Sequence, residues 1–108
     1  MASTYKVLAQ SAPSATTNTD VYTVGSGKSA VVSTITVCNR STSATYRIAV
    51  RPAAATLANQ HYIAYDATVA ANDTVSLTIG VTLAATDVVT VYASTANLSI
   101  NIFGAEIA

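Results

Sequence analysis

The sequence predicts an all-β protein, a single sandwich of about eight mainly antiparallel strands. β-Branched runs alternate apolar and hydroxyl side chains, and small or polar turn residues separate these runs at intervals of about 8–14 residues. In Thr74–Ile79, for example, the apolar residues Val75, Leu77 and Ile79 alternate with Thr and Ser. Strand order is not written in such a pattern, so a jelly-roll and an immunoglobulin-like sandwich both remain open.

Residues 1–19 are expected to form an N-terminal arm with a short strand, and residues 20–108 the sandwich domain. Tyr5–Ala9 has the pattern of the short strand. Gln10–Thr19, rich in Ser, Ala and Thr around Pro13, is typical of an extended arm or long loop. Such a segment either reaches a neighbouring subunit or remains a disordered tail.

The other strands are expected within the sandwich domain, at Asp20–Val24, Ser29–Cys38, Thr45–Arg51, His61–Tyr65, Thr74–Ile79, Val88–Ala93 and Asn97–Ile107. Val88–Ala93 is apolar on both faces except at Thr90, which indicates a central strand. Pro52–Asn59 is the one helix-like patch, because Pro suits a first helical turn and three alanines follow it. We expect a single turn there.

The period-two pattern also predicts which side chains face the core. The expected core residues are Ile35, Val37, Ile48, Val50, Val75, Leu77, Ile79, Ile100 and Ile102. In Thr45–Arg51 the same alternation places Arg47 and Arg51 together on the outward face.

The composition favours a subunit covered by neighbours. The chain has 108 residues with a formal net charge of zero, and 51% of its residues are hydrophobic. A neutral surface offers little repulsion between copies, so we expect a homo-oligomer. The alternative is an ordinary β domain with a hydroxyl-rich surface. Zero net charge argues against a nucleic-acid surface, and no apolar run approaches the length of a membrane helix, so neither nucleic acid nor membrane is expected as a partner.

No residues at catalytic or ligand spacing are found. Gly25–Ser29 ends like a phosphate-binding loop, but Tyr22 stands where that motif needs its first Gly, and a β-branched run follows, so a hairpin turn is the better interpretation. His61 is the only histidine, and Cys38 the only cysteine, which is expected to be a small buried hydrophobe. We therefore expect no enzyme, metal or cofactor.

The aspartates are expected to cap turns. Asp66, Asp73 and Asp87 each lie next to a predicted strand, where Asp commonly accepts hydrogen bonds from its own turn. A calcium site shared between such turns is the alternative, although the EF-hand spacing is absent.

Protein–protein contact is the function for which side chains can be proposed. The candidate interface residues are Pro13, Tyr46, Arg47, Arg51, Tyr62, Tyr65 and Tyr92. The tyrosines are of a kind that stacks on sugars, although such residues more often lie half-buried at sheet ends or subunit contacts.

Several strand sequences together resemble small virion structural proteins of tailed bacteriophages, particularly phages of cyanobacteria and marine bacteria. The resemblance rests on Ser33–Arg40, Tyr46–Pro52, His61–Asp66, Ala71–Thr74 and Asp87–Ala93. It implies an accessory β-sandwich of the virion that assembles with other virion proteins and with copies of itself. It carries over no functional residues, and it leaves capsid surface, neck, tail and fibre base open. A carbohydrate- or host-surface-binding module of a phage fibre is the alternative.

Overall fold

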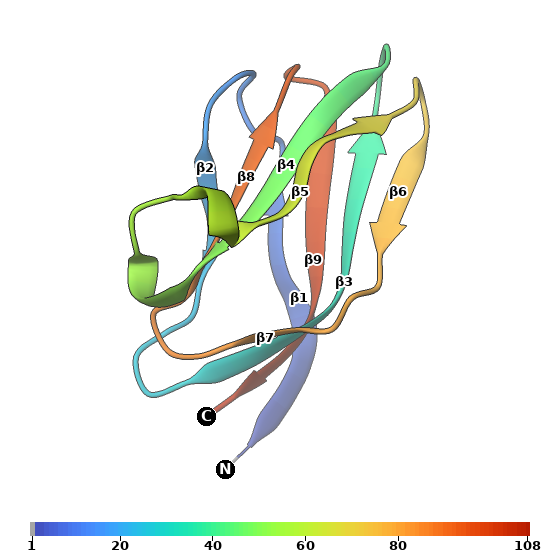
Figure 1. The fold of residues 1–108 in the computed structure, drawn as a ribbon. Coiled ribbons are helices and arrows are strands. Elements are labelled where there is room, and N and C mark those ends of the chain that lie inside the picture. The colour runs from blue at the N-terminus through green and yellow to red at the C-terminus, as the bar shows by residue number, and fades with distance from the viewer. Residues whose placement is uncertain (1) are drawn as a thin grey trace.

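Nine strands in two antiparallel sheets make up the computed structural model, which describes residues 2–108 (Figure 1). The strands are β1 (Ser3–Ser11), β2 (Thr19–Thr23), β3 (Ser29–Asn39), β4 (Ala44–Arg51), β5 (Tyr62–Val69), β6 (Thr74–Leu77), β7 (Val81–Leu83), β8 (Val88–Ala93) and β9 (Leu98–Ile107). The predicted all-β sandwich is therefore confirmed.

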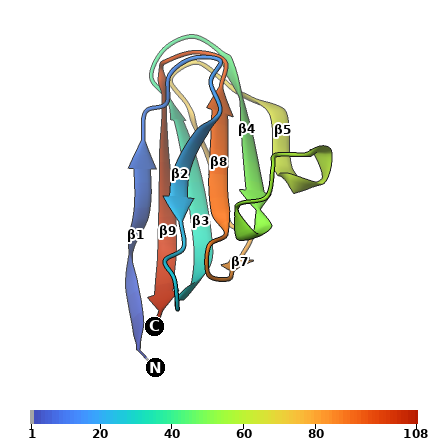
Figure 2. The same cartoon turned by 90° about the vertical axis from the view of Figure 1, so that its left-hand side faces the viewer.

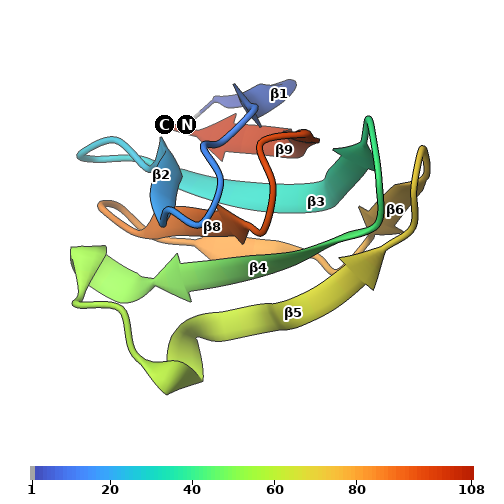
Figure 3. The same ribbon diagram turned by 90° about the horizontal axis from the view of Figure 1, so that it is seen from above.

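The strand order is that of a jelly roll. Sheet A has the order β1-β9-β3-β6, with β7 also paired to β3, and sheet B has the order β2-β8-β4-β5. Figure 3 shows the two sheets as two layers. The chain changes sheet at every connection except β4–β5 and β6–β7. In an immunoglobulin sandwich several consecutive strands share a sheet instead. Its first and second strands do so, and so do its last two strands. The structure thus decides between the two alternatives that the sequence left open.

The core lies between the sheets and follows the period-two pattern. On the central pair of sheet A, Ile35 lies opposite Ile102 and Val37 opposite Ile100. Ile35, Val37, Ile48, Ile100 and Ile102 are all at most 1% exposed, as predicted. Val50, Val75 and Leu77 are partly buried and pack against this core.

The prediction for Ile79 is wrong, because this side chain is 50% exposed. Strand β6 ends at Leu77, and the chain turns at Gly80, whose φ is +60°. Ile79 therefore lies in the connection to β7 rather than in the hydrogen-bonded ladder, and the alternating pattern no longer fixes the direction of its side chain.

The N-terminal segment packs on the sandwich. Strand β1 pairs with β9 from Ser3 to Ser11 and forms one edge of sheet A, as Figure 2 shows. Further along, Ala15 bridges to Ala93 and Pro13 is buried. The segment expected to be an extended arm is thus held against its own sheets. The first strand is also longer than predicted, since it runs from Ser3 to Ser11.

Two other local predictions are refined. The helix-like patch forms two separate 3-10 turns, η1 (Pro52–Ala54) and η2 (Asn59–His61). Cys38 is partly exposed rather than buried, because on β3 its neighbours Val37 and Asn39 take the inward direction. No helix within residues 2–108 is long and apolar enough to cross a membrane.

Candidate functional site

Four of the seven candidate interface residues meet on the outer face of sheet B. The guanidinium carbon of Arg47 lies 4.3 Å from the ring centroid of Tyr65 and 4.3 Å from that of Tyr92. The ring of Tyr62 meets that of Tyr65 edge to face, with centroids 4.9 Å apart. We call Arg47, Tyr62, Tyr65 and Tyr92 the arginine–tyrosine cluster. Arginine between two rings gains cation–π attraction on both of its faces.

A β-bulge builds this cluster. Across β4 and β5 the register passes from Tyr46 opposite Ala67 to Ile48 opposite Ala64, so Arg47 faces two residues instead of one. These are Tyr65 and Asp66, and Asp66 has a positive φ of 50°. A bulge re-aims side chains in this way. As a result Arg47 lies against the Tyr65 ring and also donates two hydrogen bonds to the Asp66 carboxylate, at 2.7 and 3.3 Å.

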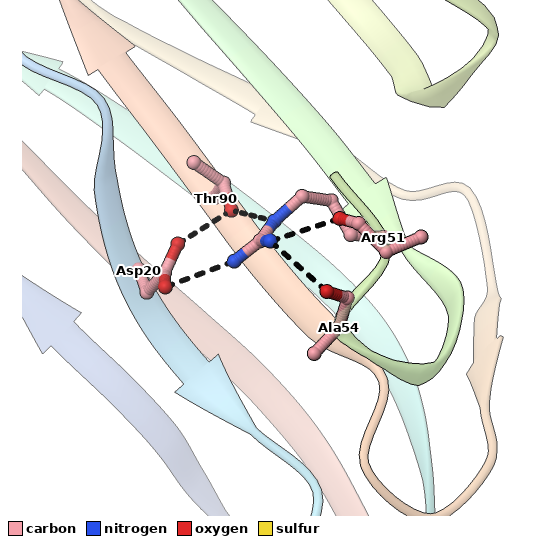
Figure 4. Close-up of polar contacts among 5 residues, drawn as sticks. Asp20, Arg51, Ala54 and Thr90 are labelled. Atoms are coloured by element: carbon pink, nitrogen blue, oxygen red, sulfur yellow. Dashed lines mark hydrogen bonds and ion pairs between the residues drawn. The ribbon is translucent and has the colours of Figure 1, made fainter. Parts of the chain in front are cut away.

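Arg51 lies farther along the same face and ties three strands together (Figure 4). Its Nε donates to Thr90 Oγ1 at 3.0 Å, and its Nη2 donates to Asp20 Oδ2 at 2.9 Å. Thr90 Oγ1 in turn donates to Asp20 Oδ1 at 2.8 Å. Nη1 donates to the carbonyl oxygen of Ala55 at 2.9 Å, which holds the loop after β4. Arg51 is therefore occupied with stabilising β2, β4 and β8, and its charge is compensated.

The remaining two candidates point inward. Tyr46 is 3% exposed, because it alternates with Arg47 along β4 and takes the core side. Pro13 is buried as well. Neither side chain is presented to a partner in this structure.

A second surface, which the sequence reasoning missed, lies on the outer face of sheet A. It is an open apolar groove of about 690 Å³ over β1, β9 and β3. The residues lining it are Ser3, Tyr5, Lys6, Val7, Val31, Ser33, Phe103, Gly104, Ala105 and Ile107. Tyr5 is 87% exposed, Val7 46% and Val31 38%. The outward alternation of apolar residues in β1 and β9 was the available signal. We call this surface the sheet A groove.

The charge beside the groove is neutralised. Lys6 Nζ lies 2.9 Å from Glu106 Oε1, and Tyr22 donates its hydroxyl proton to Glu106 Oε2 at 2.7 Å. The hydrogen bonds from Tyr22 and then Lys6 lower the pKa of Glu106. Burial and the hydrogen bond to Glu106 raise the pKa of Tyr22. Both shifts move the pKa values further from neutral pH, at which the carboxylate is ionised and the phenol protonated.

The aspartates and the histidine have structural partners. Asp87 Oδ2 accepts from the Ala84 N–H, which closes the turn before β8 as predicted. His61 is buried, and its Nδ1 accepts from the Ala58 N–H at 3.0 Å. Within the part of the chain that the structure describes, no three His, Cys, Asp or Glu side chains are grouped to hold a metal ion.

No protein-family model matches the chain, and no curated protein or solved structure is significantly similar to it. The resemblance to tailed-phage virion proteins therefore remains a prediction, and the functional argument depends on the two outer sheet faces.

Proposed function

We propose that this protein is a structural component of a tailed-bacteriophage virion and acts by protein–protein assembly. It would serve as a capsid decoration or cement protein, or as an accessory protein of the neck, tail or baseplate. Its partners would be other virion proteins and copies of itself, and its location the virion.

The sheet A groove is the observation that carries this proposal. The groove gathers exposed apolar side chains, Tyr5, Val7 and Val31, on one sheet face, and their burial against a partner is favourable. The chain also has zero net charge, which lowers repulsion between closely packed subunits. The jelly-roll fold supports the proposal only generally, since it occurs in viral capsid proteins and in lectins alike.

The proposal is tested on gradient-purified particles of a phage that encodes this chain. Quantitative mass spectrometry measures its copy number per particle, and antibody labelling under the electron microscope gives its position. We expect a fixed copy number and one class of position. A chain that is expressed during infection but missing from purified particles would contradict the proposal.

Carbohydrate binding is the second candidate function, and the arginine–tyrosine cluster is the observation that favours it. Tyr65 is 58% exposed and lies beside the Asp66 carboxylate, which offers an aromatic surface next to a hydrogen-bond acceptor. Arg47 already covers one face of the Tyr65 ring, which reduces the surface left for a sugar.

A glycan array of host-surface saccharides followed by calorimetry tests this second candidate. If it holds, Tyr65→Ala abolishes binding and Tyr5→Ala, which removes an exposed ring from the opposite sheet, leaves it unchanged. Equal effects of the two substitutions, or no binding by the unmodified protein, would exclude the cluster as a sugar site.

A further inference from the structure

We propose that the sheet A groove docks the same groove of a second copy of this chain about a two-fold axis, with Tyr5 of each copy inserted into the groove of the other. This inference rests on the assembly function proposed above and names its first partner and surface.

The shape of the surface is self-complementary. Tyr5 projects from β1, and it is the most exposed of the large apolar side chains of the described chain, at 87%. The groove beside it lies over the small residues Ser33, Gly104 and Ala105. A projection and a hollow on one patch are what a two-fold interface requires, because each copy then offers both halves of the contact. An aromatic anchor filling a pocket is also the usual centre of a stable interface.

The charge of the surface favours a copy of the chain over a charged partner. Lys6 is the one charged residue that lines the groove, as far as the described residues go, and its ammonium group is paired with Glu106. A partner with its own charges at this place would have to bury them without counter-charges, which is costly. A second neutral apolar face carries no such penalty.

Val31 separates docking through the face from pairing through the strand edge. It lies on β3, two strands away from the β1 edge, and faces outward opposite Ala105. A charge at Val31 therefore interferes with a partner that covers the groove, whereas a partner strand added to β1 would not contact it.

Sedimentation velocity of the full chain over a range of concentrations tests the proposal. We expect the unmodified protein to pass from monomer to dimer as concentration rises. Tyr5→Arg and Val31→Arg should each weaken the dimer by at least about tenfold, which corresponds to about 1.4 kcal/mol. Ile63→Arg and Ile79→Arg are the matched controls, since these apolar side chains are 44% and 50% exposed on other surfaces. They should leave the dissociation constant unchanged. Thermal melts establish that each variant is folded.

Three results would overturn the inference. The unmodified chain could remain monomeric throughout; the controls could weaken the dimer as much as the groove variants; or Val31→Arg could leave the dimer intact while Tyr5→Arg weakens it, which would place the contact at the strand edge. Particle analysis is independent of these results. If the protein is monomeric but present in virions, the proposed function stands and only the dimer is refuted. If it is dimeric but missing from virions, the dimer stands and the proposed function is refuted.

Discussion

Asn39 is the most completely enclosed polar side chain of the described structure, at 1% exposure. Its Nδ2 donates to the carbonyl oxygens of Thr42, Val69 and Ala70, and its Oδ1 accepts from the Ser41 N–H at 3.0 Å. One amide thereby joins the turn after β3 to the turn after β5. Nothing in the sequence distinguishes this Asn from a loop residue, because Ser41 and Thr42 are the neighbours of any turn residue, and Val69 and Ala70 lie about 30 residues away.

Asn39→Ala is expected to lower the free energy of unfolding by about 1–3 kcal/mol, since it leaves buried carbonyl and N–H groups without partners. Urea denaturation measures the change. Asn101→Ala is the control, because its bond to Gln10 is exposed and its loss should cost no more than about 0.5 kcal/mol. Equal effects of the two substitutions would show that the Asn39 bonds contribute nothing specific.

Glu106 makes the stability of the folded protein depend on pH, and the direction of this dependence follows from the lowered pKa of Glu106. The folded state binds the proton of Glu106 less tightly than the unfolded chain, so this contribution to stability is present above the unfolded pKa of about 4.3. It is lost as pH falls through the folded pKa. Thermal midpoints between pH 7 and pH 3 should therefore fall more steeply for the unmodified protein than for Glu106→Gln. Parallel curves would contradict this.

Among the elements, β9 is the strand whose two neighbours both have a bulge beside the same residue. The register shifts after Val7 on β1 and after Val32 on β3, both next to Phe103. At the adjacent Gly104, an added Cβ would come within 2.0 Å of the Val31 carbonyl oxygen. Backbone approaches backbone here, so only glycine fits without a displacement of the strand.

Gly104→Ala is therefore expected to destabilise the fold by several kcal/mol or to change the pairing of β9 with β3. Hydrogen exchange of the β3 and β9 amides, together with denaturation, measures both effects. Gly25→Ala is the control, because its added Cβ would meet its nearest neighbour at an ordinary 3.5 Å. If Gly104→Ala were as stable as the unmodified chain, that result would contradict a close approach of β3 and β9 at this residue.

Strands β6 and β9 also differ in how much their side chains contribute. Ile102 is fully buried on β9, so Ile102→Ala should cost about 2–5 kcal/mol. Leu77 lies at the sheet edge on β6 and is only partly buried, so Leu77→Ala should cost less. Denaturation of both variants measures the difference, and a larger loss at Leu77 would contradict the edge position of β6.

The strands were predictable from the sequence where the alternation of side chains along the strand matches their burial. Val88–Ala93 was predicted with the bounds that the structure has. Its inward side chains pack in the core, and on its outer face Arg51 and Arg47 cover Thr90 and Tyr92. The prediction failed where a short turn interrupts the alternation of side chains. Ile79 was expected in the core, and the strand β7 was not expected at all. At the arginine–tyrosine cluster, the outward direction of Arg47 was predictable, but its contact with Tyr65 depends on a bulge that no local pattern marks.

At the scale of the whole molecule, the strand order was not predictable, because it is fixed by contacts between distant parts of the chain. Strand β9 lies between β1 and β3, so the last strand fills the gap between the first and third. The sheet A groove depends on this order, since β1, β9 and β3 all line it. Its residues come from both ends of the chain, and the sequence alone gives no reason to bring them together.

The same order predicts how the whole sandwich responds to removal of its N-terminus. Deletion of residues 1–11 removes β1, exposes the β9 edge, and takes away Leu8 and Ala9, which pack against the core. We expect the free energy of unfolding to fall by about 2 kcal/mol or more, which is the scale of burying one leucine side chain. Urea denaturation measures this change. Tyr5→Ser keeps the strand and removes only an exposed ring, so it should leave the stability nearly unchanged. A deleted chain as stable as the full one would show that β1 contributes nothing to the stability of the sandwich.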